Sequence, residues 1–217
     1  GEVGSGKTML CRMLLEKLPS HVETVYLATP SLSRDDILHA IADELKIDLP
    51  VLRAHQTLRA LQERLLEIYA SGRQVVVMID EAHAMPAETL EEVRLLSNLE
   101  SNRHKLLHIV LFGQPELDER LSAKDMRQLK DRITHNFALE PLHHSDVGKY
   151  LMFRLRAAGY RGPDLFTTSA VRLISKASQG LTRRINILAD KGLLSAFSDG
   201  RHIVDYRQIK AAIRDAQ

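Results

Sequence analysis

The sequence contains little cysteine and no long apolar run. Its 217 residues include a single cysteine, Cys11, which excludes a framework of internal disulfides and is typical of a protein in a reducing compartment. Cys11 falls on an apolar helical pattern, so we expect a buried, inert thiol. No apolar stretch approaches the roughly 18 residues that a membrane-spanning helix needs. With 44% hydrophobic residues, the chain can bury a core and form one large or two small domains.

Glutamate is absent from the last third of the chain. Residues 145–217 contain 13 Lys or Arg, six Asp and no Glu, a net charge of +7, whereas residues 1–144 contain 17 basic and 22 acidic residues, a net charge of −5. This shift predicts two domains, 1–144 and 145–217. A basic domain could contact nucleic acid, dock on the acidic domain of a neighbouring subunit, or simply be solvated. We favour the subunit contact.

The chain begins with a phosphate-binding pattern, G-x-x-x-x-G-K-T, in Gly1-Glu2-Val3-Gly4-Ser5-Gly6-Lys7-Thr8. Glycines let backbone N–H groups converge on phosphate oxygens, because no Cβ stands in the way. Lys7 would contact the β- and γ-phosphates, and the Thr8 hydroxyl would bind Mg²⁺. The residues from Met9 to Leu18 predict a helix whose positive dipole end faces the same anion. All eight motif residues and Met9 are therefore candidate nucleotide-binding residues.

A phosphate-binding loop of this kind follows a strand. The sequence has no residue ahead of Gly1 and no initiating Met. We therefore expect the first central strand of a sheet, and a segment that contacts the nucleotide base, to be missing from this sequence. Base specificity is not readable from the residues that remain.

A second motif follows the apolar run at residues 75–79, which predicts a strand buried on both faces of a parallel sheet. The run ends in Asp80 and Glu81, at the strand edge where open α/β sheets bind ligands. Asp80 would hold Mg²⁺, and Glu81 would orient and partly deprotonate the attacking water. The separation from Lys7 accommodates an intervening strand, which is typical of P-loop ATPases with an additional catalytic-glutamate strand. His83 could sense the γ-phosphate or contact a neighbour, and we favour a surface polar role.

Further strands are predicted at residues 22–28, 106–112 and 135–139, which gives an α/β fold with a parallel five-stranded sheet whose first strand is truncated. Gln114 follows the strand at 106–112 and could contact the γ-phosphate or the attacking water; a simple turn residue is the competing interpretation. Arg132 precedes the last strand, where its guanidinium could project toward the nucleotide of another subunit.

Beyond Pro141 the pattern predicts an all-α, four-helix domain. Arg183 and Arg184 fall in the first turn of its third helix, where cations oppose the helix dipole. A nucleotide phosphate near that turn would account for them, and solvation of both side chains is the alternative. The predicted helices are residues 146–158, 168 or 169 to 177, 182–198 and 206–216.

The order of these motifs resembles an AAA+ ATPase, with a P-loop, Walker B, sensor one, an arginine finger and a four-helix lid that carries sensor two. Within that superfamily the sequence is similar to the secretion and pilus-biogenesis ATPases called ExeA, or general secretion pathway protein A, and MshM of the MSHA pilus. The similar segments are Gly1 to Thr8 with Leu10-Cys11-Arg12, Ile79-Asp80-Glu81-Ala82-His83, Leu111-Phe112-Gly113-Gln114-Pro115-Glu116-Leu117 and Arg183-Arg184-Ile185-Asn186.

The resemblance implies an ATPase, with ATP and Mg²⁺ as cofactors, that powers or licenses assembly of a type II secretion or MSHA-type pilus machine. It implies a cytoplasmic domain that could lie at the inner membrane, with envelope assembly proteins as partners. Members of the family often continue into a transmembrane helix and a periplasmic peptidoglycan-binding domain, so a membrane would be reached through partners or through segments absent here.

The resemblance also assigns roles by position. Lys7, Glu81, Gln114 and Arg132 would serve catalysis, Thr8 and Asp80 the metal, and Arg183 the nucleotide as sensor two. A finger at Arg132 would act in trans and so requires a homo-oligomer, usually a ring. Two rivals to Arg132, namely Arg120 and Arg127, stay open, as does Arg184 for sensor two.

Two other functions stay open. An AAA+ regulator of transposition or replication initiation would bind DNA through a very similar core, although no helix-turn-helix, zinc motif or winged domain follows here. A nucleotide-binding scaffold that does not hydrolyse ATP would need Lys7 and would tolerate loss of the Glu81 carboxylate.

Overall fold

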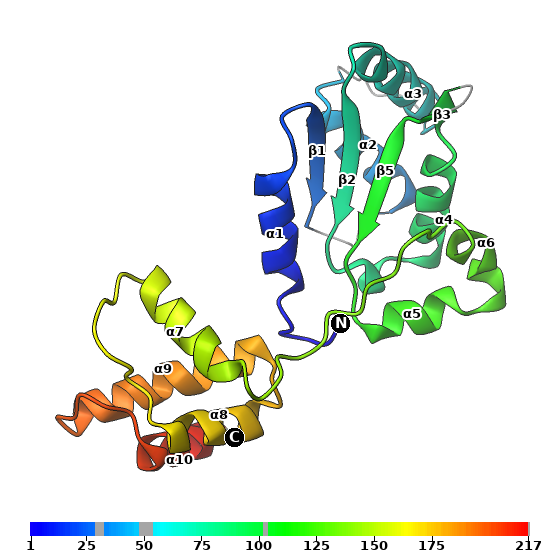
Figure 1. Cartoon of the computed structure of the whole chain (residues 1–217). Helices are drawn as coiled ribbons and strands as arrows, with labels where there is room; N and C mark the ends of the chain where they lie inside the picture. Colours follow the sequence, from blue (N-terminus) through cyan, green and yellow to red (C-terminus); the bar gives the residue numbers. More distant parts are fainter. Residues whose placement is uncertain (29–32, 48–53, 102–103, 217) are drawn as a thin grey trace. The chain divides into compact units, whose positions relative to one another are not determined.

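The computed structural model describes four stretches of the chain, residues 1–28, 33–47, 54–101 and 104–216. Within them the chain forms two compact units (Figure 1). One is Lys7–Phe137, here called the α/β unit, and the other joins Gly1–Gly6 to the residues from Ala138 onward and is called the helical unit. The division into domains at residues 144 and 145 rests on composition and stays a prediction.

A parallel sheet in the order β1-β2-β5 organises the α/β unit. In its register Val25 lies opposite Val77, and Val77 lies opposite Ile109. Parallel neighbours need a crossover connection, which helices provide here. The strands are β1 (Val22–Leu27), β2 (Gln74–Ile79) and β5 (Leu107–Leu111), and the larger helices are α1 (Lys7–Lys17), α2 (Arg34–Glu44), α3 (Ala54–Ala70) and α4 (Ala87–Leu96). A separate antiparallel pair consists of β3 (Glu100–Ser101) and β4 (His104–Lys105).

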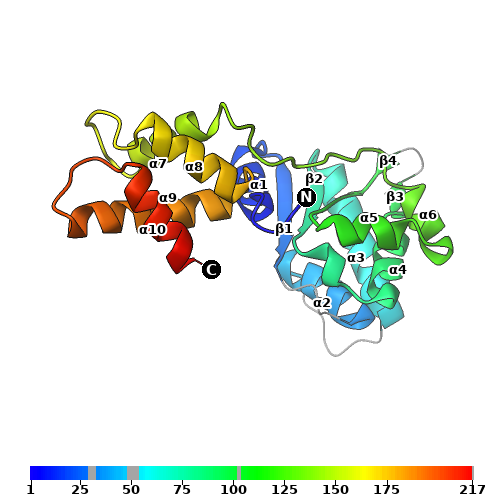
Figure 2. The same ribbon diagram turned by 90° about the horizontal axis from the view of Figure 1, so that it is seen from below.

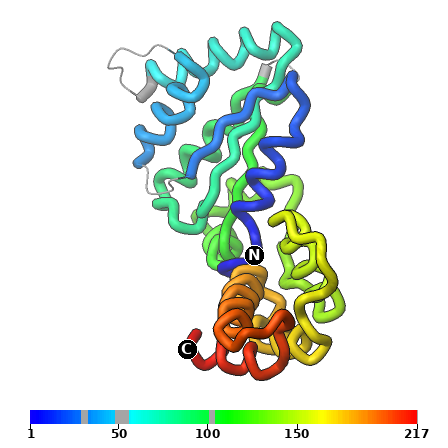
Figure 3. Tube along the Cα trace, turned by 90° about the vertical axis from the view of Figure 1, so that its left-hand side faces the viewer, coloured from blue at the N-terminus to red at the C-terminus, as the bar shows by residue number. Residues whose placement is uncertain are grey.

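Helices cover both faces of the sheet. Side chains along a strand point alternately to opposite faces, so Val75 and Val77 of β2 enter the core formed with α2, α3 and α4. Val76 and Met78 face the other way, toward Cys11 on α1. Figure 3 shows α1 and α2 on opposite sides of the strands. The prediction of a β2 strand covered on both faces is confirmed, and this burial explains why its apolar run is uninterrupted.

The strand predicted at residues 135–139 is wrong. That stretch has no regular secondary structure, and Phe137 within it is 86% exposed. A strand needs a neighbour to pair its backbone N–H and C=O groups, and within the described residues the sheet has three strands and ends at β5. Residues 135–139 therefore pair with no strand among the described residues.

The helical unit is built from four main helices, as the sequence pattern predicts. They are α7 (Val147–Ala157), α8 (Thr168–Ser178), α9 (Thr182–Ser198) and α10 (Tyr206–Asp215). Figure 2 shows α8, α9 and α10 side by side, and their core includes Ile174, Ile185 and Ile209. The N-cap of α7 is Asp146, and the Ser145 hydroxyl shares a hydrogen bond with His143 Nδ1.

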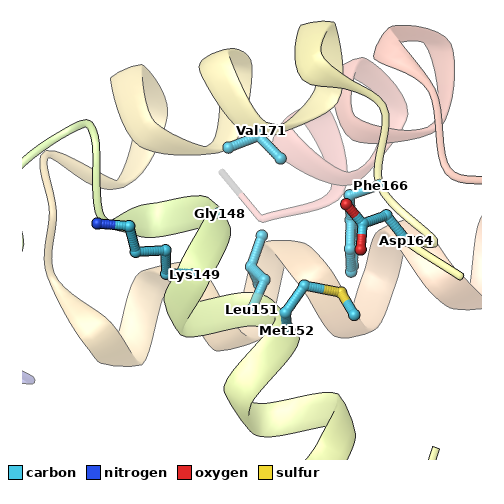
Figure 4. A pocket seen from close by; sticks show the side chains of 7 residues that line it. All are labelled: Gly148, Lys149, Leu151, Met152, Asp164, Phe166 and Val171. Atoms are coloured by element: carbon cyan, nitrogen blue, oxygen red, sulfur yellow. The ribbon is translucent and has the colours of Figure 1, made fainter. Parts of the chain in front are cut away.

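A hollow of about 270 Å³ lies between α7 and the start of α8. In Figure 4, Val171 of α8 faces Leu151 across it, while the Lys149 ammonium points away. None of the residues predicted for nucleotide binding lines this hollow, so it is not the candidate site. Among the described helices, none is both long enough and apolar enough to cross a bilayer.

Cys11 lies on the side of α1 that faces the sheet, where it is fully buried and its thiol donates to the Met78 sulfur at 3.7 Å. Burial, and then the negative charge of Asp80, raises the pKa of its thiol from 9.0 to about 11. Since the thiolate is the reactive form, the folded chain should hold about 100-fold less of it at pH 8 than the unfolded chain. Thiol-reactive dye should therefore label the native chain far more slowly than the chain in guanidinium. Equal rates in the two conditions would show that Cys11 is exposed and ionised.

Candidate functional site

Thr8 and Asp80 meet at the carboxyl edge of the sheet. Thr8 lies in the first turn of α1, and Asp80 directly follows β2. The Thr8 Oγ1 hydroxyl donates a hydrogen bond of 2.7 Å to Asp80 Oδ2. The Asp80 backbone N–H donates to Leu27 O at 3.0 Å, which anchors this residue to β1, and Asp80 is 3% exposed. The sheet therefore brings together two candidate metal ligands that are 72 positions apart in the sequence.

Tyr26, on the neighbouring strand β1, supplies a second hydroxyl to the same carboxylate. Its Oη lies 3.4 Å from Asp80 Oδ2, while the Glu81 backbone N–H donates to Asp80 Oδ1 at 2.9 Å. Burial first, and then the Asp80 charge, raises the pKa of the Tyr26 phenol, so it stays a protonated donor at neutral pH. The Asp80 carboxylate and the Thr8 hydroxyl together offer the oxygen ligands that Mg²⁺ prefers.

Glu81 has a left-handed backbone, with φ 53° and ψ 30°. For a residue other than glycine this conformation costs about 1–2 kcal/mol. It persists because the next residue is anchored: Ala82 N–H donates to Phe112 O at 2.8 Å, just beyond β5. The turn leaves the Glu81 side chain 44% exposed while Asp80 stays buried. The two adjacent carboxylates therefore have different surroundings, which suits different chemical roles.

His83 and Gln114 form a polar contact beside Glu81. His83 lies in the short 3₁₀ helix η1 (Ala82–Ala84), and Gln114 caps α5 (Pro115–Leu121). The two Nε2 atoms are 2.7 Å apart, and His83 Nε2 is 3.5 Å from Glu81 Oε2. The prediction of a surface role for His83 is wrong, because its side chain is only 16% exposed and packs into this cluster.

The glycine loop, Gly1–Gly6, belongs to the helical unit, where it contacts the start of α9. Gly4 O accepts hydrogen bonds from Arg183 N at 3.0 Å and from Thr182 Oγ1 at 2.7 Å. Gly4 and Gly6 have φ of 78° and 106°, in the region that favours glycine. The Ser5 hydroxyl oxygen is buried and has no hydrogen-bond partner among the described residues. Such an atom fits a loop that is completed by a polar ligand.

The candidate arginines differ in how they are held. In the α/β unit Arg132 is exposed, and within the described part of the chain its guanidinium makes no ion pair or side-chain hydrogen bond. Arg127 is also exposed, whereas Arg120 Nη1 donates to His83 O at 2.5 Å and so has a role within its own unit. In the helical unit Arg183 lies against Gly4. These contacts favour Arg183 over Arg184 and leave Arg132 and Arg127 as finger candidates.

Sequence reasoning missed Tyr26 and Thr182 and misread His83. Tyr26 gave a signal only as one of several strand-forming residues in the run at 22–28, and Thr182 only as a helix start. Each contacts a motif residue that is distant in the sequence: Tyr26 meets Asp80, and Thr182 meets Gly4. The only signal for His83 was its position two residues after Glu81.

Replacing Gly4 tests the packing of the loop. In Gly4→Ala, the new Cβ would lie 2.6 Å from Arg183 Cβ, at a φ of 78°. Gly200→Ala is a matched control in the same unit, because its φ is 66° and nothing lies within 4 Å of the added atom. Both variants place a Cβ on a left-handed backbone, which lowers the free energy of unfolding. In Gly4→Ala the free energy of unfolding should fall by about 1–3 kcal/mol more, because the added Cβ is overpacked. Thermal unfolding should show the larger drop in melting temperature for Gly4→Ala; equal drops would contradict the contact.

Comparisons with known proteins bear on this site. General secretion pathway protein A of Aeromonas hydrophila is 41% identical to the chain over 213 residues, which cover 98% of the chain and 39% of that protein. Cdc6p from Pyrobaculum aerophilum matches with a TM-score of 0.75 at 20% identity, covering 94% of the chain and 56% of that protein. The ORC2 protein of Aeropyrum pernix, solved in ADPNP–ADP complexes, matches with a TM-score of 0.70 at 16% identity, covering 99% of the chain and 60% of that protein.

The two solved structures show the fold alone, because their identities are below 25%. They confirm the predicted α/β P-loop fold of the AAA+ class, although the five-stranded sheet is not confirmed. The chain spans about two fifths of its secretion relative, so what that whole protein does is not carried over by the match. A family model described as an AAA domain matches residues 1–121, more than half of the sequence. The chain belongs to the AAA domain family.

Proposed function

We propose that this chain binds Mg·ATP and hydrolyses it, as an oligomeric AAA+ ATPase that acts in the assembly of a secretion or pilus machine. The observation that carries the proposal is the 2.7 Å hydrogen bond between Thr8 Oγ1 and Asp80 Oδ2. It joins the end of the phosphate-binding motif to the acidic pair after β2. A glycine-rich turn with no ligand would not need a buried carboxylate beside it.

Mg²⁺ fits the donor set of Thr8 and Asp80. A hydroxyl and a carboxylate are hard oxygen ligands, and Mg²⁺ usually takes one or two protein ligands and fills its other positions with water and phosphate. Bound there, it would neutralise charge on the β- and γ-phosphate oxygens. A buried Asp80, 3% exposed, is well suited to a cation because burial of an isolated carboxylate is costly. Both protein ligands are already oriented by their mutual hydrogen bond.

The glycine loop would bind the triphosphate. Gly4 and Gly6 have the left-handed φ values that let backbone N–H groups turn toward an anion. The buried Ser5 hydroxyl, which has no partner among the described residues, could bind the same anion. Lys7, only 8% exposed, begins α1 and would place its ammonium on the β- and γ-phosphates. In the helical unit, Arg183 lies against Gly4 and would act as sensor two.

Side chains that follow β2 and β5 in the sequence would catalyse the hydrolysis of ATP. Glu81, with its partly exposed carboxylate, would accept a proton from the attacking water. Gln114 would orient that water or the γ-phosphate. Arg132, exposed in its own unit, would complete the site of a neighbouring subunit, so we propose that the active form is a homo-oligomer, with a ring as the expected arrangement.

We propose the biological setting from the relative of Aeromonas hydrophila, General secretion pathway protein A, which is 41% identical over the aligned residues. We propose type II secretion or an MSHA-type pilus as the process, envelope assembly proteins as partners, and the cytoplasmic side of the inner membrane as the location. A DNA-binding AAA+ regulator is the alternative, and the net charge of +7 in residues 145–217 is the observation that favours it.

Phosphate release from ATP tests the enzymatic part. The chain should release phosphate in Mg²⁺ and lose that activity in excess EDTA, and specific activity should rise with protein concentration as oligomers form. Affinity for duplex DNA that falls steeply with salt would instead support the regulator. No phosphate release at any protein concentration would refute the ATPase proposal.

A further inference from the structure

The cluster formed by Glu81, His83 and Gln114 contains one residue, His83, to which the proposed mechanism gives no task. Its imidazole is only 16% exposed and lies between a proposed base and a proposed sensor. Gln114 Nε2 lies 2.7 Å from His83 Nε2, and Glu81 Oε2 lies 3.5 Å from the same nitrogen. One imidazole nitrogen therefore faces both groups that would act on the attacking water.

The backbone around His83 is fixed from two sides. Ala82 N–H donates to Phe112 O at 2.8 Å, which ties η1 to the end of β5. Arg120 Nη1 donates to His83 O at 2.5 Å, which ties η1 to α5. Because η1 follows Glu81 directly, these bonds also hold the left-handed turn that presents the Glu81 carboxylate. The imidazole is thus carried on a rigid backbone, as precise positioning requires.

The hydrogen bond between His83 and Gln114 fixes where the imidazole lies relative to Glu81. In a neutral imidazole one nitrogen donates and the other accepts, and His83 Nε2 can pair with the Gln114 amide in either role. In both cases the contact holds Nε2 3.5 Å from Glu81 Oε2, while Nδ1 is buried and has no partner among the described residues. Without the Gln114 amide, the imidazole loses the contact that holds it beside Glu81.

We propose that His83 is a positioning residue that couples Gln114 to Glu81 in the hydrolysis of ATP. The Gln114 amide holds the imidazole with Nε2 toward Glu81, and the imidazole in turn fixes the distance between the sensor and the base. This inference rests on the proposed ATPase function. It makes His83 and Gln114 one functional unit rather than two independent ones.

A double-mutant cycle tests the coupling. His83→Ala and Gln114→Ala should each lower kcat by about tenfold or more, with ATP affinity changed little, and the double variant should be no slower than the slower single variant. His83→Gln, whose amide oxygen can reach the position of Nε2, should retain most of the activity, whereas the shorter His83→Asn should not. His21→Ala, at an exposed histidine, is the matched control. Multiplicative losses in the double variant would overturn the coupling.

A second measurement needs no ATP. In the ¹⁵N-histidine-labelled full chain, Gln114→Ala should shift the Nε2 signal of His83, because the variant removes the hydrogen-bond partner of that nitrogen. An unchanged Nε2 signal would overturn the pairing. If the wild-type chain is active and His83→Ala keeps its kcat, the inference alone fails. If the wild-type chain releases no phosphate, the ATPase proposal fails and the role of His83 fails with it.

Discussion

Glu81→Gln is expected to bind ATP as tightly as the wild-type chain and to hydrolyse it about 10²–10⁴-fold more slowly, the range for loss of a general base. Glutamine has nearly the same shape, so the left-handed turn at φ 53° and the position beside His83 should survive. What is lost is the ability to accept a proton from water. The expected signature is therefore bound ATP that is not turned over.

Single-turnover kinetics with labelled ATP would measure binding and cleavage separately. Glu88→Gln is the matched control, because Glu88 is an exposed glutamate in the first turn of α4 and the same chemical change there should leave kcat unchanged. Cleavage at the wild-type rate in Glu81→Gln would remove Glu81 from the mechanism. If that variant also supported secretion in cells while Lys7→Ala did not, the scaffold function would be favoured.

Arg132→Ala is expected to lower kcat by about 10³-fold or more, the effect of losing an arginine finger, while each subunit still binds ATP. The guanidinium is exposed and makes no ion pair within the described residues, so its removal should leave the melting temperature unchanged. A structural arginine such as Arg120, which donates to His83 O, should instead lower stability when it is replaced.

Mixing two inactive variants tests whether the finger acts in trans. Arg132→Ala keeps the nucleotide site, and Lys7→Ala keeps the finger, so mixed oligomers should recover activity that neither variant has alone. Arg127→Ala serves as the comparison because Arg127 is the rival exposed arginine. If Arg127→Ala is inactive and Arg132→Ala is active, Arg127 is the arginine finger. If no mixture recovers activity, the site is complete within one subunit.

The parts of the fold governed by local pattern were predictable. The apolar run of β2 and the 182–198 helix are confirmed. Each depends on neighbours in sequence: strand formers in a row, or a helical stripe of apolar residues. The order of the motifs also predicted Asp80 at the carboxyl edge of the sheet, where it directly follows β2.

What failed depends on partners distant in sequence. The segment at 135–139 has the composition of a strand but pairs with no strand in the part of the chain that the structure describes, so its residues alone could not decide its state. His83 sits in a polar tetrapeptide that suggests the surface, yet α5 and Gln114 cover it. Tyr26 acquires its hydroxyl contact with Asp80 only through the β1–β2 register. Such contacts require the folded sheet.

Calorimetric titration with Mg·ATP tests the central claim, that Lys7, Thr8 and Asp80 bind one triphosphate with its metal, most directly. The wild-type chain should bind, and Lys7→Ala should bind about 10- to 100-fold more weakly, which corresponds to the loss of a charge-assisted contact. Lys17→Ala, at the exposed end of the same helix, should bind like the wild type. Equal affinity in the Lys7 and Lys17 variants would contradict the claim.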